Sequence, residues 1–146
     1  MPPILMDTNI LVYTFDPRDI KRQEQAIDVL LELEERKAGC LSAQCLSEFA
    51  NVVIAKRLLP SQEIIRKLDG WRNAFPVYNL TPQVVLEAVR GVRDYQLSYY
   101  DAQIWAAARL NQVSTVFSED FQDGQTIEGI RFANPFADAF HIDDWL

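Results

Sequence analysis

Cysteine and histidine are scarce in this chain of 146 residues. Its two cysteines, Cys40 and Cys45, are too few for a disulfide framework. Together with the single histidine, His141, they also supply too few soft ligands for a structural zinc site. We therefore expect both thiols to lie in the core as small apolar groups.

Long apolar runs are also missing. No stretch approaches the roughly 20 apolar residues that a membrane-spanning helix requires. The apolar run at residues 3–6 stops at Asp7, which is too early for the core of a secretory signal. These absences predict no membrane association and a cytoplasmic location. With no repeat or linker-like segment, the sequence predicts a single domain over residues 1–146.

Positive charge is in short supply: 14 lysines and arginines face 21 aspartates and glutamates, giving a net charge of −7. Such a balance disfavours a broad electrostatic grip on nucleic acid, because proteins that bind in this way usually carry a basic face. It suits a protein whose carboxylates hold metal ions, or one whose partner is basic.

Apolar periodicity predicts strands that alternate with helices along the whole chain. Strands are expected at residues 3–6, 40–42, 76–80, 114–117 and 130–133, and helices at about 10–15, 17–38, 43–58, from 60 onward, 82–95 and 99–111. This alternation is typical of an α/β domain with a parallel sheet covered on both faces. In such sheets, ligands bind beyond the carboxyl ends of the strands.

The second predicted helix has the clearest boundaries. Pro17 suits its first turn, and Gly39 suits the position that follows its last turn. Its apolar spacing predicts a buried side made of Ile20, Ala26, Ile27, Leu30, Leu31 and Leu33.

Two aspartates directly follow predicted strands. Asp7 follows the first strand and Asp120 the fourth, where a parallel sheet presents its ligand-binding edge. Each position also has a purely structural explanation. Asp7 suits the N-cap of the next helix, and Asp120 belongs to an acidic turn that also contains Glu119 and Asp123. The choice among these three acids stays open.

Two further acids lie on predicted helices. Glu48 lies at the border of the apolar face of its helix, where a glutamate is usually just solvated. Asp101 enters a helix that is apolar on nearly every side and is therefore expected to be buried. Ser98 and Asp101 together resemble a capping box, which is the structural alternative. A carboxylate that enters a buried helix needs a partner, and a cation is one candidate.

These four carboxylates can all reach one edge of the sheet. Carboxylates that lie together repel one another, which raises some of their pKa values unless cations neutralise them. Oxygen ligands select hard ions such as Mg²⁺ or Mn²⁺. Without a base of the His or Cys type in the pattern, the expected chemistry is metal-assisted attack of water on a phosphodiester.

At these residues the chain resembles the PIN domain family, and specifically the VapC-type toxins of toxin–antitoxin pairs. The resemblance spans essentially the whole chain. It is carried by Met6-Asp7-Thr8-Asn9, Ser47-Glu48-Phe49, the segment Tyr100–Ala108 and Ser118-Glu119-Asp120. The order and spacing of the four acids match the family. One departure is Gly124, where many members have an aromatic residue.

The resemblance implies a PIN-like three-layer α/β/α sandwich around a mainly parallel sheet of four or five strands. It implies an endoribonuclease that hydrolyses RNA with one or two Mg²⁺ or Mn²⁺ ions. The implied metal ligands and catalytic residues are Asp7, Glu48, Asp101 and Asp120. Supporting roles are implied for Thr8 and Ser118, whose hydroxyls would lie beside the metal, and for Glu119 and Asp123.

The resemblance also implies partners: an RNA substrate, an antitoxin protein that brings a basic side chain to the acids, and a second copy of the chain in a homodimer. Lys56 and Arg57 are candidates for a local RNA-binding strip, although a solvated helix end is the simpler explanation. Trp71, Phe75 and Trp145 are candidates for the dimer surface, but we expect them in the core.

Four other interpretations differ from this one in the residues or the activity they require. A haloacid-dehalogenase-like phosphatase requires a second aspartate two residues after the first, where this chain has Asn9. A phosphorylated receiver domain requires an acidic pair before the phosphoacceptor strand and a late lysine, and neither is clear here. A PIN-like module that binds metal or RNA without turnover, or a housekeeping RNA-processing nuclease, remains open.

Overall fold

A computed structural model of the protein describes residues 3–146. Its strands are β1 (Ile4–Met6), β2 (Gly39–Ser42), β3 (Val77–Tyr78), β4 (Thr115–Phe117), β5 (Thr126–Ile127) and β6 (Ile130–Ala133). Its helices are α1 (Thr8–Tyr13), α2 (Ile20–Glu35), α3 (Ala43–Ala55), α4 (Ser61–Ala74), α5 (Pro82–Tyr95) and α6 (Tyr99–Leu110), followed by a 3₁₀ helix (Ile142–Asp144).

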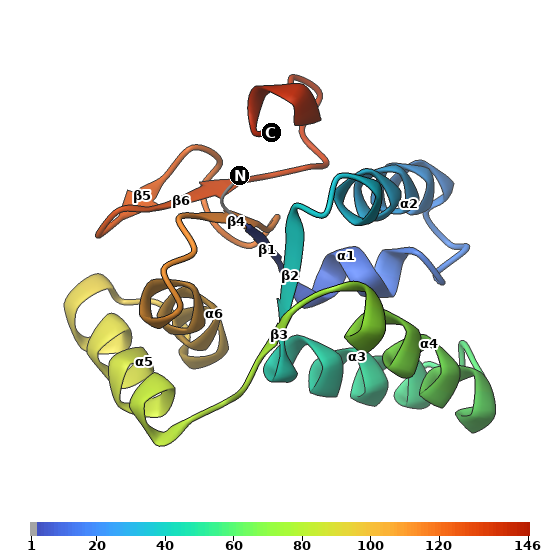
Figure 1. The fold of residues 1–146 in the computed structure, drawn as a ribbon, viewed down its shortest axis with the longest axis horizontal. Helices are drawn as coiled ribbons and strands as arrows, with labels where there is room; N and C mark the ends of the chain where they lie inside the picture. Colours follow the sequence, from blue (N-terminus) through green and yellow to red (C-terminus); the bar gives the residue numbers. More distant parts are fainter. Residues whose placement is uncertain (1–2) are drawn as a thin grey trace.

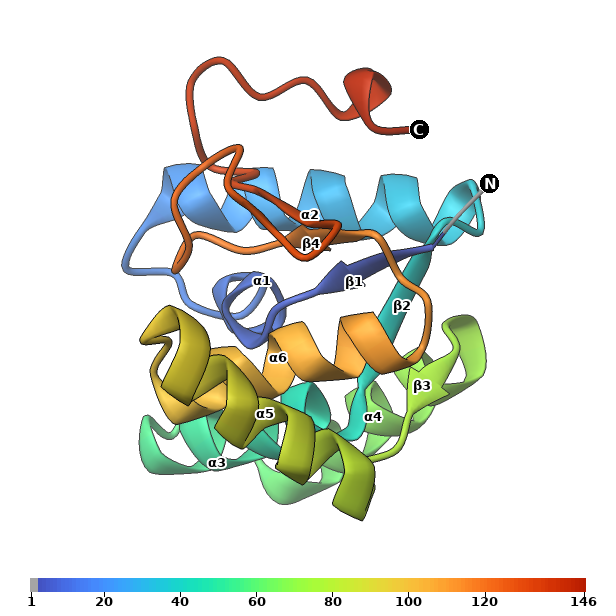
Figure 2. The ribbon, with the colours of Figure 1, turned by 90° about the vertical axis from the view of Figure 1, so that its left-hand side faces the viewer.

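The strands form one sheet in the order β3-β2-β1-β4-β6-β5. All neighbouring strands run parallel except β5, which pairs antiparallel with β6. Helices α5 and α6 lie on one side of this sheet, and α1 to α4 lie on the other (Figure 1). In Figure 2, α5 and α6 face the viewer in front of the sheet. The predicted α/β/α sandwich with a mainly parallel sheet is confirmed, but the sheet has six strands and not the expected four or five, because β5 adds a short antiparallel strand at its edge.

The connections make a topological switch point between β1 and β4. From β1 the chain moves outward to β2 and β3, and it then returns through α5 and α6 to enter β4 on the other side of β1. The chain therefore leaves the carboxyl ends of these two neighbours in opposite directions. Such a switch point is where open α/β sheets bind their ligands.

Two predictions about α2 were wrong. The helix begins at Ile20 because Asp19 is its N-cap and accepts a hydrogen bond from the Arg22 amide at 3.1 Å. It ends before Gly39, and Lys37 takes the left-handed conformation with φ of 53°. Gly39 instead begins β2, where a Cβ would lie 2.9 Å from the Phe75 ring. This glycine serves close packing and is not a cap.

The buried side of α2 also differs from its prediction. Ala26 and Leu33 are buried and Leu30 partly so, together with Val29. The remaining predicted members are exposed: Ile20, Ile27 and Leu31. A window of apolar residues wider than one helix face cannot be buried against a single sheet.

The hairpin of β5 and β6 was only half predicted. β6 lies at the expected residues, but β5 contributes just two residues and gave no periodic signal. Ile127 pairs with Ile130, and the two residues between them, Glu128 and Gly129, both have positive φ. This is the geometry of a two-residue hairpin turn whose twist matches the strands.

Most of the expected core residues are buried. Cys40 and Cys45 are fully buried free thiols, and burial raises the pKa of each to about 12. Trp71 and Phe75 are buried, whereas Trp145 is partly buried against the core. Among residues 3–146, no helix has the length and apolar character needed to cross a bilayer.

Candidate metal centre

Asp7 occupies the first residue position after β1, at the switch point beside β4. Its backbone amide donates to the Phe117 carbonyl at 3.0 Å, which extends the β1–β4 pairing by one step. Its Oδ1 accepts from the Thr8 amide at 2.7 Å, so Asp7 is the N-cap of α1. The structural explanation for Asp7 is therefore correct, and it does not exclude a functional role for the same carboxylate.

The second oxygen of Asp7 connects it to the turn after β4. Ser118 is buried and donates from its hydroxyl to Asp7 Oδ2 at 2.7 Å. The same hydroxyl accepts from the Asp120 amide at 3.1 Å. Ser118 thus fixes the Asp7 carboxylate and the backbone at Asp120 relative to each other.

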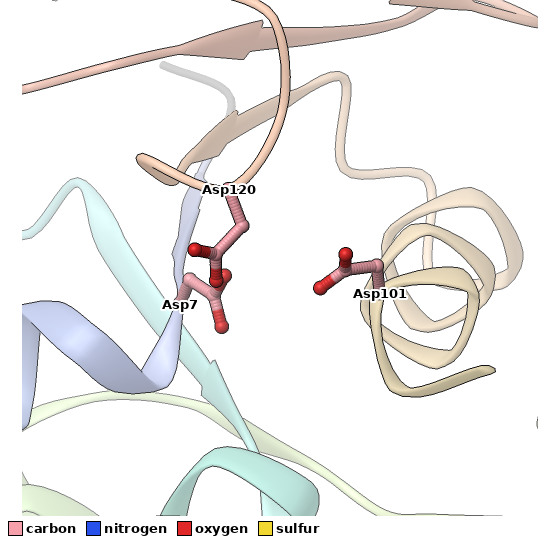
Figure 3. A group of neighbouring side chains, drawn as sticks. All are labelled: Asp7, Asp101 and Asp120. Carbon is pink, nitrogen blue, oxygen red and sulfur yellow. The ribbon is translucent and has the colours of Figure 1, made fainter. Parts of the chain in front are cut away.

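Asp101 approaches from the first turn of α6. Helix α6 is buried from Ala102 to Ala108, as predicted, and Asp101 is half-buried where the helix begins. Ser98 is the N-cap residue but makes no side-chain capping hydrogen bond, so the alternative of a capping box is wrong. The Asp101 carboxylate is directed toward Asp7 and Asp120 (Figure 3).

These three aspartates form the acidic site. One carboxylate oxygen from each of Asp7, Asp101 and Asp120 lies within 4.8 Å of the others. Burial is the main cause that raises the pKa of Asp7 to about 7, opposed by the hydrogen bonds from Ser118 and Thr8. The pKa of Asp120 is also raised, first by desolvation and then by the negative charge of Asp101. The site therefore carries charge that the chain does not neutralise.

Glu48 lies beside the acidic site and is held by neutral partners. Its Oε2 accepts from the Thr8 hydroxyl at 2.9 Å, and its Oε1 accepts from Gln44 Nε2 at 2.8 Å. Its negative charge contributes to the raised pKa of Asp120. The structure thus brings the predicted Glu48 and Thr8 to the edge of the site, while the three oxygens that lie closest together come from the aspartates.

Glu119 and Asp123 are directed into other contacts. Glu119 accepts from the Tyr13 hydroxyl at 2.6 Å and pairs with Arg22 at 3.2 Å. Asp123 accepts from the Asn134 backbone amide at 2.9 Å. Of the three acids that the sequence left open, Asp120 is the one whose carboxylate joins Asp7 and Asp101.

The turn after Asp120 explains the departure at Gly124. Its backbone has φ of 81°, a conformation that a side chain at this position would strain. Its amide donates to the Phe132 carbonyl at 2.8 Å, which joins the turn to β6.

Lys56 and Arg57 form the exposed end of α3, and Lys56 helps to lower the pKa of Asp16.

Sequence reasoning missed two residues that support the acids. Asn9 Nδ2 donates to Asp120 Oδ2 at 3.2 Å. Gln44 is buried and holds Glu48 as described above. Both are neutral amides that touch a carboxylate. The spacing of Gln44 and Glu48, four residues apart in a helix, was the one available signal.

The donor set fits a divalent cation. The three aspartates supply only oxygen, the ligand type that Mg²⁺ and Mn²⁺ prefer. Within residues 3–146, none of the three aspartates forms an ion pair with lysine or arginine, although Glu119 next to Asp120 does. A buried carboxylate with a raised pKa beside two others is what a bound cation would relieve.

A sequence model of the PIN domain matches residues 4–122. The chain belongs to the PIN domain family. The match begins in β1 and ends just after Asp120, so all four predicted acids of this PIN domain lie inside it. No curated protein sequence matches the chain.

Solved structures share the fold. A toxin–antitoxin complex from Klebsiella pneumoniae is 22% identical, with a TM-score of 0.65, over 90% of this chain and 97% of that one. VapC20 of Mycobacterium tuberculosis, a sarcin–ricin loop cleaving toxin, is 17% identical, with a TM-score of 0.64, over 88% and 98%. DNA-bound VapBC from Salmonella typhimurium is 18% identical, with a TM-score of 0.64, over 92% and 99%. At these identities the likeness is one of fold.

Proposed function

We propose that this PIN domain is an endoribonuclease that hydrolyses RNA phosphodiester bonds with Mg²⁺ or Mn²⁺. The observation that carries the proposal is the convergence of Asp7, Asp101 and Asp120, with oxygens within 4.8 Å, at the switch point of the sheet. The domain is taken to span residues 1–146, since β5 and β6 extend the same sheet beyond the matched region.

In this proposal Asp7, Asp101 and Asp120 hold the cation, and Glu48 is a further ligand or orients one. When bound, the cation would supply Lewis acidity that activates water and stabilises charge on the phosphate. Ser118 and Thr8 fix the carboxylates of Asp7 and Glu48 through their hydroxyls. Holding these groups in advance is what makes such a site effective, because no reorganisation is needed during the reaction.

We further propose that the enzyme is the toxin of a type II toxin–antitoxin pair and acts in the cytoplasm. Support comes from solved relatives in fold that are toxin–antitoxin complexes or toxins. The net charge of −7 and the unpaired acidic site suit an antitoxin that inserts a basic side chain. For a homodimer, α5 offers exposed apolar side chains at Val85, Leu86, Val89 and Val92.

The decisive experiment is RNA cleavage by purified protein freed of any partner. We expect Mn²⁺ or Mg²⁺ to support cleavage of RNA, EDTA to stop it, and Asp101→Asn to lack it while remaining folded by circular dichroism. Equal cleavage by the wild type and Asp101→Asn would exclude the proposed site. Metal binding without cleavage of any RNA would favour the alternative of a PIN-like binding module.

A separate observation distinguishes a toxin from a housekeeping nuclease. The toxin proposal expects a short reading frame for an antitoxin with a DNA-binding N-terminus directly upstream. It also expects growth arrest when the chain is produced alone and recovery when the neighbour is produced with it. Normal growth under production of an active enzyme would favour RNA processing.

A further inference from the structure

A groove of about 940 Å³ adjoins the acidic site. One wall is α3, which contributes Gln44, Glu48 and Asn51, and the other is the beginning of α6. Gln44 Nε2 bridges the two helices by donating to the Tyr100 carbonyl at 3.1 Å. Since Glu48 and Gln44 belong both to the groove and to the edge of the acidic site, a ligand in one lies next to the other.

Two tyrosine rings line this groove at the first turn of α6. Tyr99 and Tyr100 are 37% and 63% exposed, and their ring centroids lie 5.4 Å apart in an edge-to-face arrangement. The rest of α6, from Ala102 to Ala108, is buried. Packing of the core therefore accounts for the body of the helix but not for two adjacent aromatic rings that face solvent beside the acids.

The polar lining of the groove is neutral apart from Glu48. It consists of amides and hydroxyls and contains no lysine or arginine, counted over the described residues. Gln44 is buried, and its Oε1 has no hydrogen-bond partner among residues 3–146. A buried acceptor without a donor is unfavourable, so an N–H group of a ligand that reached this oxygen would satisfy it.

We propose that Tyr99 and Tyr100 form a stacking surface for unpaired nucleobases of the RNA substrate, next to the phosphodiester held at the acidic site. This inference rests on the proposed ribonuclease function and adds how the substrate is held. Proteins recognise single-stranded RNA by stacking bases on aromatic rings and by hydrogen bonds from amides to base edges. A neutral groove cannot neutralise phosphates, so here the bases supply the contact that a basic strip supplies elsewhere.

The lining favours RNA bases over the other two occupants. A basic antitoxin segment would gain one acid here, Glu48, and that acid already has two partners. A second copy of the chain would need an apolar surface, and besides the tyrosines the larger apolar side chains are only Val52 and Leu80. Aromatic rings, amides and an adjacent metal site fit an unpaired oligonucleotide best.

The test measures binding and cleavage separately. Binding of a short single-stranded oligoribonucleotide is followed by fluorescence anisotropy in the Asp101→Asn background, which prevents cleavage during the titration. Tyr100→Leu removes the ring and Tyr100→Phe keeps it. Leu31→Ala, at a position that is 57% exposed on α2 outside the groove, is the matched surface control. A second ligand is the same ribose–phosphate chain without bases.

Stacking predicts that Tyr100→Leu weakens binding about 5- to 100-fold, the range expected for loss of one base–aromatic contact. Tyr100→Phe and Leu31→Ala should bind like the parent. The chain without bases should bind weakly and equally to the parent and to Tyr100→Leu. With catalytic Asp101 restored, Tyr100→Leu should lose cleavage of limiting RNA while its metal affinity, measured by calorimetry, is unchanged.

Several outcomes overturn the inference. Equal binding of the RNA by the parent and by Tyr100→Leu does so, as does absence of RNA binding by the parent. The groove is assigned to a second copy if Tyr100→Leu loses RNA binding and also converts a dimer to a monomer, while the parent binds the chain without bases as tightly as it binds RNA. The proposed function is judged apart, because ring-dependent binding without any cleavage supports the stacking surface and rejects the nuclease.

Discussion

Two groups of acidic side chains in this PIN domain differ in their partners, because one group pairs with arginine and the other does not among residues 3–146. On α5, α6 and the β5–β6 turn, Glu87 and Glu128 are neutralised by arginine. Arg90 contacts Glu128 through both terminal nitrogens, at 2.7 and 3.1 Å, and also contacts Glu87, which Arg109 approaches at 3.1 Å. At the acidic site, Asp7 accepts from the Thr8 amide and the Ser118 hydroxyl and Asp120 accepts from the Asn9 side-chain amide, and no arginine or lysine pairs with either among residues 3–146.

Ionisation of the two groups has opposite effects on the stability of the fold. Pairing with arginine lowers the pKa of Glu87 and takes that of Glu128 to about 2, so ionisation of these acids stabilises the fold. Burial without a cation raises the pKa of Asp7 to about 7, so its ionisation opposes the fold. Among residues 3–146, arginines pair with Glu87 and Glu128, and none pairs with the carboxylates that we propose bind a cation.

The largest expected effect comes from Asp7→Asn. Loss of a carboxylate from the metal site should lower RNA cleavage by at least about 100-fold, the upper limit for residues that only orient a ligand. The same change removes a buried charge, so the melting temperature in EDTA at neutral pH should rise. Cleavage assays and differential scanning fluorimetry test the two halves. A mutant that loses both activity and stability would show that Asp7 serves the fold alone.

Substitutions of the two adjacent acids in the turn after β4 should have different effects on Mn²⁺ affinity. Asp120→Asn should weaken Mn²⁺ binding by about 10-fold or more, because its carboxylate lies in the cluster. Glu119→Gln should bind Mn²⁺ nearly as well as the wild type, since its carboxylate contacts Tyr13 and Arg22. Isothermal titration calorimetry gives both affinities. Equal losses would mean that the turn acts as one unit.

Metal should act on only one of the two acidic groups. At about 100 times the dissociation constant, Mn²⁺ should raise the melting temperature by about 5–10 °C, as preferential binding to the folded state requires. Removal by EDTA should reverse the shift, and Asp101→Asn should lack it. A shift of the same size in Asp101→Asn would place the bound metal somewhere other than the acidic site.

Removing Arg90 from its network with Glu87 and Glu128 should affect stability and not cleavage. Arg90→Gln leaves Glu87 and Glu128 without their main partner and should lower the melting temperature by a few degrees while cleavage is unchanged. Arg66→Gln is the matched control, because Arg66 is 74% exposed and pairs only with its helix neighbour Glu63. Equal effects of the two substitutions would show that the network adds nothing beyond a surface pair.

The smallest expected effect is a pair of opposite pH slopes in EDTA. The raised pKa of Asp7 means that the folded state holds a proton which the unfolded state releases near pH 4, so stability falls as pH rises from about 4 to 7. The lowered pKa of Glu128 gives stability above about pH 4.5 that is lost toward pH 2, and exposure to solvent keeps this contribution small.

Urea unfolding across this pH range checks the slopes. Asp7→Asn should remove the fall in the free energy of unfolding between about pH 4 and 7 and leave the loss toward pH 2 unchanged. Arg90→Gln should reduce only the loss toward pH 2. If Asp7→Asn leaves the pH dependence between about pH 4 and 7 unchanged, ionisation of Asp7 does not destabilise the folded state, and the contrast between the two acidic groups fails.

The sequence was sufficient for features that depend on local pattern. Asp7 and the acidic turn that contains Asp120 could be placed because strand ends at a switch point are fixed by the alternation of strands and helices. Burial of the Asp101 helix followed from its apolar composition. The first residue of α2 and the role of Gly39 were wrong because an aspartate cap and a ring from another helix decided them.

Features that depend on contacts between distant elements could not be read. Whether Glu48 or Glu119 faces the acids depends on which neighbour reaches it, and those neighbours, Thr8 and Arg22, are far away in the sequence. The antiparallel strand β5 has two residues, too few for any periodicity. Such contacts are set by packing, which a single sequence does not display.

The bond between Ser118 and Asp7 joins residues that are 111 positions apart. Contacts of this separation form late, because the chain between them must be ordered first. The acidic site therefore does not exist until β4 has paired with β1 and the following turn has reached Asp120. A ribosome-bound or truncated chain that ends before this turn lacks the site altogether, so a cell that makes this protein meets the assembled acids only after synthesis has passed Asp120.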